Sequence, residues 1–402
     1  MRKITTIADN YSSITQEMRV RILLVSFAAA LTLLSSCKKQ PRLDIRETDF
    51  RNKSEQIAKA VHVDTQLPLQ ICGIINCDSL NILISQDPGG YVFVYSDDWE
   101  PLGKFCLQGR ARNEFVNRPG YIRKQVFKGE EGHLLLPLQD ETSIKVMDVT
   151  QSLLSGKGVI SQIRVYSPYY LQPLQMDGYQ ANLRISLEFL FLDNDINNTL
   201  EYNQGFEFEL GNVDEHYWIR HDTAFMKLPT VLSDMLDLAG PQPPKQFQRR
   251  FFKHPGRNLI VEPFQLSDYM MFYDLDQDRS YGIHQEGSPT LKDEPKEVPR
   301  YDENGEFDDM DYERGCFEEA LPFEDYLLVF YYGGDYSMSD PNKDWPRPEV
   351  MLFDWDGNFK KSIKLDTYID YPAFDQRTKT LYGVPMKEDE EILSFDLSPL
   401  FE

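Results

Sequence analysis

The alternation of apolar and polar residues is clearest in the segment Pro348–Asp366. Glu349–Phe353 is rich in residues that favour strands, and Asp354–Gly357 has the composition of a tight turn. Phe359–Leu365 then returns with apolar residues on one face and lysines on the other. A period of two residues with one wet face predicts an antiparallel β-hairpin.

Looser copies of this hairpin recur along the chain, each marked by an apolar pair or single apolar residue that leads into an aspartate at a turn. They are Tyr95-Ser96-Asp97, Val146-Met147-Asp148, Phe191-Leu192-Asp193, Phe272-Tyr273-Asp274, Leu352-Phe353-Asp354 and Ser394-Phe395-Asp396. The aspartates are 51, 45, 81, 80 and 42 positions apart, and three of these gaps fall near the ~40–50 residues of a propeller blade. The pattern predicts one repeated unit, with insertions in the two long gaps.

Strand signals are dense in the first quarter of the chain. Leu43–Phe50 alternates apolar and charged residues and could be a lone strand, whereas Lys53–Val63 tolerates a helix. Three β-rich segments follow, separated by turn residues: Leu80–Ser85, Tyr91–Ser96 and Leu102–Leu107. We expect them to form a three-stranded meander.

The two long gaps hold segments of a different kind. Thr223–Leu238 has apolar residues at helical spacing, and Gly240–Pro244 would end such a helix. Ser288–Glu319 is rich in proline and acidic residues, which is typical of a solvated loop. The strongly apolar segment Phe323–Tyr332 then predicts a buried strand.

Composition agrees with an all-β fold. The chain has 402 residues, 13% of them aromatic, with 24 prolines and 23 glycines, a mixture that suits pleated surfaces joined by many short turns. The net charge is −23. A body this acidic repels phosphate backbones, so we expect no nucleic-acid partner.

The segment Met18–Cys37 resembles an export signal. Arg19 and Arg21 precede an apolar run of thirteen residues, Ile22–Leu34, which suits a signal peptide but is short for a membrane span. It ends in Leu34-Ser35-Ser36-Cys37, which resembles the lipobox of bacterial lipoproteins. The resemblance implies a signal peptide over residues 1–37 with Met18 as the true start, lipidation (palmitate) at Cys37, and a tether over residues 38–42.

A second resemblance lies beyond the first meander. Gly109, Arg110, Glu114 and Phe115 match the segment Gly-Arg-x-x-x-Glu-Phe of the TolB-like six-bladed β-propeller lipoproteins of Gram-negative bacteria, whereas Ala111 and Arg112 depart from it. The order of lipobox, strand, first blade, segment and further blades also resembles that family. It implies an all-β, six-bladed β-propeller with short helical or loop insertions over residues 43–402, in which Leu43–Phe50 completes the last blade beside Ile392–Phe395.

Several groups of residues are candidates for a metal or catalytic site. Asp274, Asp276 and Asp278 have the spacing that opens a calcium loop, although Arg279 and Gln285 stand where such a loop needs Gly and Glu. A solvated hairpin tip is the simpler interpretation, and it also applies to Asp193–Asp195, Asp354–Gly357 and the acidic group in Asp302–Asp309.

Histidines, cysteines and tryptophans add weaker candidates. His216 and His221 lie close to acidic residues, but five positions do not bring them together on a strand or a helix. Cys72, Cys77, Cys106 and Cys316 could form disulfides outside the cytoplasm, with Cys72 and Cys77 the nearest pair, or remain free thiols. Trp99, Trp218, Trp345 and Trp355 fit core packing better than a binding surface.

The residues favour a lipid-anchored binding or scaffold module of the cell envelope, at the outer membrane with its facing left open. Its partner would be a protein, a peptide or a glycan, and no cofactor is required. The alternative is a hydrolase or lactonase-like propeller enzyme that holds a divalent cation such as calcium. Because a propeller supports both functions, its fold alone does not decide between them.

Overall fold

The computed structural model describes residues 44–402 with internal gaps. The gaps are 52, 88, 112, 117, 122–125, 130–131, 141–142, 166–168, 177–178, 192–198, 204–216, 221–223, 228–251, 266, 275, 278, 291–296, 302–306, 313–315, 333–346 and 386–389. Side chains are also left undescribed at 120–121, 143–144, 162–227 and 297–312. The chain divides into two units, Met1–Arg42 and Leu43–Glu402, and every described residue belongs to the second.

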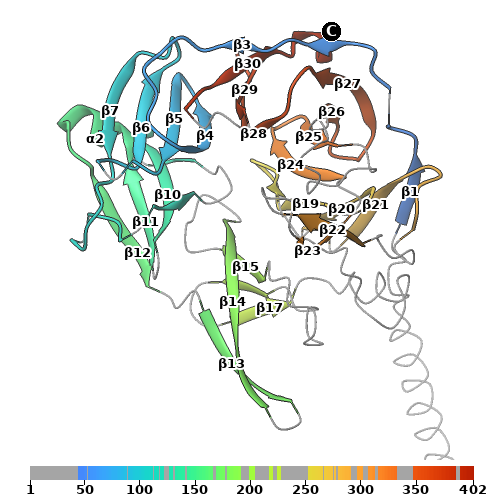
Figure 1. The fold of residues 1–402 in the computed structure, drawn as a ribbon, viewed down its shortest axis with the longest axis horizontal. Coiled ribbons are helices and arrows are strands. Elements are labelled where there is room, and N and C mark those ends of the chain that lie inside the picture. Colours follow the sequence, from blue (N-terminus) through green and yellow to red (C-terminus); the bar gives the residue numbers. More distant parts are fainter. Residues whose placement is uncertain are drawn as a thin grey trace, which may run out of the picture. The chain divides into compact units, whose positions relative to one another are not determined.

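Five sheets of consecutive antiparallel strands form the blades of a β-propeller, numbered here in chain order (Figure 1). Blade 1 contains β4 (Ile71–Cys77), β5 (Leu80–Ser85), β6 (Val92–Ser96) and β7 (Pro101–Phe105). Blade 2 begins with β8 (Gly120–Tyr121) and β9 (Phe127–Lys128), which pair with different parts of the next strand and together form the interrupted first strand of the blade, followed by β10 (Leu134–Asp140), β11 (Ser143–Asp148) and β12 (Ile160–Val165). Blade 3 contains β18 (Phe252–Lys253), β19 (Leu259–Pro263), β20 (Tyr269–Asp274) and β21 (Arg279–Gln285). Blade 4 contains β24 (Phe317–Pro322), β25 (Leu327–Tyr331), β26 (Glu349–Phe353) and β27 (Phe359–Leu365). Blade 5 contains β28 (Ile369–Asp375), β29 (Thr380–Pro385) and β30 (Leu393–Asp396).

The prediction of six blades is therefore corrected to five in the described part of the chain. A further sheet, described as backbone, contains β13 (Tyr169–Met176), β14 (Tyr179–Phe191), β15 (Thr199–Asn203), β16 (Tyr217–Arg220) and β17 (Ala224–Lys227). Its long strand β14 pairs with β13 through its first part and with β15 through its last residues. In a blade, each inner strand pairs with both of its neighbours along the same residues. Here β13 and β15 pair with different parts of β14, so this sheet is not a blade.

Two short helices and one hairpin complete the described elements. The helix α2 (Val149–Ser155) begins after Asp148, whose side chain accepts a hydrogen bond from the Gln151 N–H, and ends at Gly156 in the left-handed conformation. The 3₁₀ helix η3 (Ser398–Leu400) follows β30. β22 (Glu297–Tyr301) and β23 (Phe307–Tyr312) form a separate two-stranded hairpin.

Hydrophobic clusters lie between successive blades and hold them together. Along β25, Val329 belongs to the cluster shared with blade 3, whereas its neighbours Leu328 and Phe330 belong to the cluster shared with blade 5. Side chains alternate across a strand, so a strand with a blade on either side is apolar at every position. Further clusters join blade 5 to blade 1 and blade 1 to blade 2. The last blade thus packs against the first.

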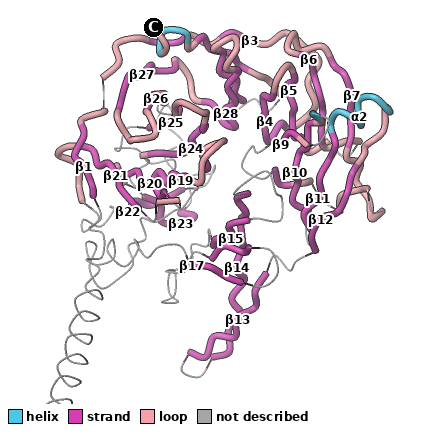
Figure 2. The backbone as a smooth tube through the Cα atoms, turned by 180° about the vertical axis from the view of Figure 1, so that it is seen from behind, coloured by secondary structure: helices cyan, strands magenta, loops and turns pink. Residues whose placement is uncertain are grey.

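An N-terminal strap, Asp44–His62, supplies an outer strand to three blades in turn. β1 (Asp44–Thr48) pairs in parallel with β21 of blade 3, and β2 (Ile57–Ala58) pairs in parallel with β27 of blade 4. β3 (Val61–His62) then pairs antiparallel with β30 of blade 5. The labels β1 and β3 mark the two ends of the strap in Figure 2.

The strap corrects the prediction that Leu43–Phe50 completes the last blade. Its described part, Asp44–Phe50, lies beside blade 3, where the ring of Phe50 is fully buried among Phe317, Tyr331 and Phe353 of blade 4. This burial fixes β1 far from blade 5, and only Val61–His62 reach the open edge that β30 leaves.

The repeated aspartate has the same place in all five blades. Asp97 follows β6, Asp354 follows β26, and Asp148, Asp274 and Asp396 end β11, β20 and β30, each the third strand contributed to its blade. Four of these carboxylates accept backbone N–H groups just after the strand: Asp148 from Gln151 at the start of α2, Asp274 from Gln277, Asp354 from Asp356 and Asn358, and Asp396 from Ser398. The repeat therefore marks the end of the third strand of each blade. Asp193 lies outside the described residues.

Of the other secondary-structure predictions, two are confirmed and three differ from the structure. The hairpin at Glu349–Leu365 and the meander of blade 1 are confirmed. The helix predicted over Thr223–Leu238 is wrong where it can be checked, because Ala224–Lys227 is strand β17. Lys53–Val63 is part of the strap rather than a helix. The loop predicted over Ser288–Glu319 contains β22 and β23, which pair with each other, and the start of β24, so a proline-rich and acidic composition does not exclude strands here.

Candidate functional site

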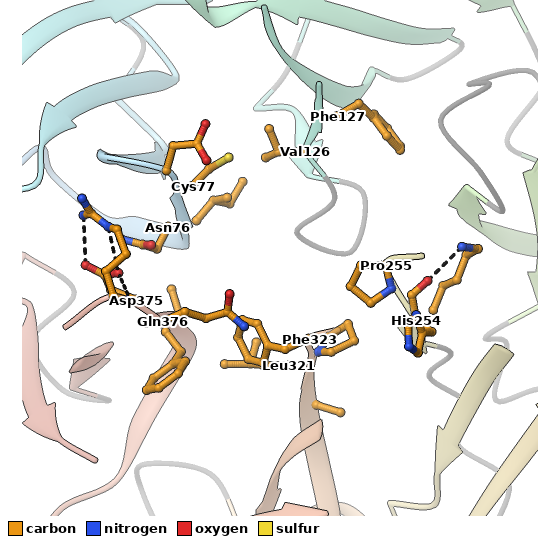
Figure 3. A pocket seen from close by; sticks show the side chains of 18 of the residues that line it. Asn76, Cys77, Val126, Phe127, His254, Pro255, Leu321, Phe323, Asp375 and Gln376 are labelled. Atoms are coloured by element: carbon orange, nitrogen blue, oxygen red, sulfur yellow. Dashed lines mark hydrogen bonds and ion pairs between the residues drawn. The ribbon is translucent and has the colours of Figure 1, made fainter. Parts of the chain in front are cut away.

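A cavity of about 580 Å³ opens where the first strands of all five blades end (Figure 3). It is lined by residues at or next to the ends of β4, β9, β18, β24 and β28. Because each blade contributes its own first strand, the side chains that face the cavity come from segments far apart in the sequence. The cavity is therefore a property of the assembled propeller and not of one motif.

The lining of blades 1 and 5 is mainly polar. Asn76 donates its amide to Asn81 Oδ1 over 2.9 Å. Asp375 is 3% exposed and accepts hydrogen bonds from the backbone N–H and the guanidinium of Arg377. The hydrogen bond with Asp375 raises the pKa of Arg377. These bonds hold the polar side of the cavity in one arrangement.

Cys77 brings a free thiol to the same side of the cavity. Burial, with the neighbouring charge of Asp78, raises the pKa of this thiol to about 11. The thiolate is the reactive form of cysteine, so Cys77 is a poor nucleophile near neutral pH. Asp78 also pairs with Lys128 over 3.0 Å, and this hydrogen bond raises the pKa of the Lys128 ammonium.

His254 is buried at the blade 3 side and is fixed by its own loop. Its Nδ1 accepts the backbone N–H groups of Gly256 at 2.9 Å and Arg257 at 3.1 Å. The ring lies 4.7 Å from the ring of Trp355. Burial, followed by the charge of Arg257, lowers the pKa of His254. The imidazole is thus neutral near pH 7 and serves as a loop acceptor.

The metal site predicted at Asp274, Asp276 and Asp278 gains no support. Asp274 accepts the Gln277 N–H and Asp276 accepts the Asn258 amide, so both carboxylates serve the hairpin turn, and Asp278 lies outside the described residues. In the part of the chain that the structure describes, no three His, Cys, Asp or Glu side chains are grouped to hold a metal ion.

Most other candidates lie at turns, in the core or outside the described residues. Cys72, Cys77 and Cys106 have thiols outside any disulfide, so the structure does not contain the suggested Cys72–Cys77 bridge, and Cys316 is buried in the core. Trp99 and Trp355 are buried, and Asp354–Gly357 is the β26–β27 turn. Cys37, His216, His221, Asp193–Asp195, Asp302–Glu306 and Trp345 lie outside the described residues.

The segment Gly103–Phe115 has a structural role between blades 1 and 2. The Gly109 N–H donates to the Phe115 carbonyl, and the Glu114 carboxylate accepts the Ala111 N–H and occupies the space that a Cβ at Gly109 would take. The Phe115 ring is fully buried, with the Lys145 ammonium 4.7 Å from its centroid. The spacing of Gly109, Glu114 and Phe115 therefore supports the packing between blades 1 and 2.

Comparison with known proteins does not identify a family. No protein-family model matches the chain, and no curated protein matches it, so the TolB-like resemblance stays a prediction. A member of the DUF4221 family from Bacteroides vulgatus is similar in structure, with 9% identity and a TM-score of 0.46 over 89% of this chain and 98% of that chain.

Two further solved structures are similar. A Bacteroides fragilis protein named as exported shares 11% identity, with a TM-score of 0.43 over 88% of this chain and 98% of that chain. A luciferin-regenerating enzyme shares 9% identity, with a TM-score of 0.42 over 84% of this chain and 95% of that chain. Likenesses this distant carry no functional conclusion for this chain.

Sequence reasoning missed the residues of the cavity. Asn76, Phe323 and Gln376 stand in no motif and are separated by long stretches of chain. Only their positions in the chain could have identified them, because each lies at or next to the end of the first strand of a blade. Using these positions requires knowing which strand of each blade comes first, and the weak strand signals at β8, β9 and β18 concealed this order.

Proposed function

We propose that this protein is a lipid-anchored binding module of the cell envelope, and that its ligand binds in the central cavity. The observation that carries the proposal is the convergence of all five first strands on a cavity of about 580 Å³. Sites for small molecules or chain ends have volumes of roughly 300–1,000 Å³ and combine apolar walls with a few fixed polar groups. The ligand is a glycan, a peptide or an exposed end of a partner protein.

Binding is favoured over catalysis by the state of the polar groups. The Cys77 thiol is held protonated near neutral pH, Nδ1 of His254 accepts two backbone N–H groups while its Nε2 is buried, and Asp375 is paired with Arg377. In the described lining, none of these groups is arranged as a nucleophile beside a general base. Fixed, mutually paired groups suit recognition.

The anchor part of the proposal rests on Arg19, Arg21, the apolar run Ile22–Leu34 and Cys37. Among the described residues, no helix is long and apolar enough to cross a membrane. An acyl chain on Cys37 would hold the propeller at the outer membrane, while its net charge of −23 disfavours nucleic acids and anionic head groups. Labelling with an alkyne fatty acid should mark the wild-type chain and not the Cys37→Ala variant.

Photo-crosslinking tests the binding site. A benzophenone amino acid placed at Gln376, an exposed residue of the cavity lining, should give a discrete adduct in intact cells. The same probe at Gln66, which is exposed and not part of the lining, is the matched control. Equal labelling at both positions, or none at Gln376, would contradict ligand binding in the cavity.

A further inference from the structure

The cavity lining combines polar and apolar groups. Blades 1 and 5 contribute the polar residues Asn76, Asp375 and Gln376 beside apolar ones, whereas blades 2, 3 and 4 contribute mostly apolar residues together with Lys128, Lys253 and His254. In Figure 3, Val126, Phe127 and Pro255 lie across the cavity from Gln376, whose side chain lies beside Leu321 and Phe323. A ligand that fills this space must offer polar groups along one edge and an apolar surface elsewhere.

The charged groups of the described lining already have partners. Asp78 pairs with Lys128 over 3.0 Å, and Arg377 pairs with Asp375 over 3.1 Å and with Asp97 over 3.3 Å. The Lys253 ammonium donates to the carbonyl of His254 over 2.9 Å. A charged ligand would lose hydration here and would have to compete with these pairs. The lining therefore favours a ligand without net charge.

The amide side chains define what the polar edge requires. Asn76 uses its amide nitrogen on Asn81, and Gln376 donates to the hydroxyl of Tyr326 over 3.3 Å. Each then offers a carbonyl oxygen that accepts a hydrogen bond. Hydroxyl groups satisfy such acceptors and can also receive hydrogen bonds from nearby donors.

We infer that the central cavity binds a neutral saccharide. A pyranose ring carries hydroxyls around its edge and C–H groups on its faces, which matches a lining that combines amides with the rings of Phe127 and Phe323. The cavity volume of about 580 Å³ accommodates a short oligosaccharide or the end of a longer one. The inference rests on the proposed binding function and names the class of its ligand.

The test uses the full-length chain in detergent and isothermal titration calorimetry. The probes are neutral di- to tetrasaccharides of glucose, galactose, mannose, xylose and N-acetylglucosamine, beside uronic-acid oligosaccharides and a set of zwitterionic tripeptides. Gln376→Ala and Asn76→Ala remove one amide each from the polar edge, and Gln66→Ala removes an exposed amide elsewhere. Gln376 is exposed, so its replacement should leave the fold intact.

We expect at least one neutral oligosaccharide to bind, about tenfold more weakly to Gln376→Ala and Asn76→Ala and unchanged with Gln66→Ala. Tripeptides that bind with the same Gln376 dependence, or preferred uronic-acid oligosaccharides, would overturn the neutral saccharide and leave the binding function standing. If no probe binds, the saccharide inference fails. The benzophenone adduct at Gln376 then decides separately whether the cavity binds another ligand.

Discussion

The outer edges of the blades are protected in two different ways. Blades 3, 4 and 5 each gain a strand from the strap Asp44–His62, whereas β7, the outer strand of blade 1, ends its sheet in the described structure. β7 is short, begins with Pro101 and carries Lys104, two residues that discourage pairing with another chain. The strap therefore does more than complete the last blade, because two of its strands pair with sheets that already have four strands.

The strap is held most firmly between blades 3 and 4. Phe50 is fully buried there, and Gln285 of blade 3 accepts the backbone N–H groups of Phe50 at 2.8 Å and Arg51 at 2.9 Å. The buried Asp268 accepts hydrogen bonds from Ser288 and Tyr331, and Arg51 lies 3.6 Å away. The strap thus connects two blades through one apolar and one polar contact.

The largest effect is expected for Phe50→Ala. Loss of a fully buried ring that contacts Phe317, Tyr331 and Phe353 should lower the free energy of unfolding by about 3–5 kcal/mol. Urea unfolding of the full chain measures it. Leu102→Ala on β7, at a side chain 47% exposed, is the control and should cost less than about 0.5 kcal/mol. Similar losses in both variants would contradict the special role of the strap.

Removing one tyrosine hydroxyl near the strap and one in blade 1 compares a buried polar contact in the two regions. Tyr331→Phe removes the hydroxyl that donates to the buried Asp268 over 2.8 Å and should cost about 1.5–3 kcal/mol, as expected for a hydrogen bond to a charged group. Tyr95→Phe in blade 1 removes a hydroxyl that donates to the Gln66 carbonyl over 2.9 Å and should cost about 0.5–1.5 kcal/mol. Denaturant midpoints of the two variants give the comparison, which fails if Tyr95→Phe is the more damaging change.

The sequence predicted well what is repeated and locally encoded. The hairpin Glu349–Leu365 and the third-strand aspartates could be found because alternation and turn chemistry act over a few residues. The number of blades could not be counted reliably, since Asp193 follows β14, a strand whose pairing differs from that of the blades. The path of the strap and the cavity lining depend on contacts between residues hundreds of positions apart, such as Phe50 with Phe353. Such contacts leave no periodic signal.

Hydrogen exchange can separate the two ends of the strap. Gln285→Ala leaves the N–H groups of Phe50 and Arg51 without their buried acceptor, at a cost of about 1–3 kcal/mol. Amide protection should fall in β1 and β21 and stay unchanged in β3 and β30. Ser394→Ala, which removes a hydroxyl that donates to the Val61 carbonyl, should have the reverse and smaller pattern. Loss of protection in β30 after Gln285→Ala would indicate that the strap detaches as one unit.

The smallest effect is a pH dependence at Asp49. Hydrogen bonds from Lys53 and then Gln285 lower the pKa of this carboxyl below its ordinary value of 3.8. Its contribution to stability is therefore present above that value and is lost as the pH falls through the lower folded-state pKa. The side chain is 47% exposed, so screening limits the contribution to a few tenths of a kcal/mol, about the worth of a surface ion pair.

Urea unfolding of wild type and Asp49→Asn at pH 7 and near pH 2 measures this dependence. The small stability difference at pH 7 should disappear at the lower pH, because the wild-type carboxyl is then protonated as well. A difference that grows on acidification would have the wrong sign for a lowered pKa. If Asp49→Asn lowers the free energy of unfolding much less than Phe50→Ala does, then burial of the Phe50 ring, rather than surface charge, holds the strap on the blades.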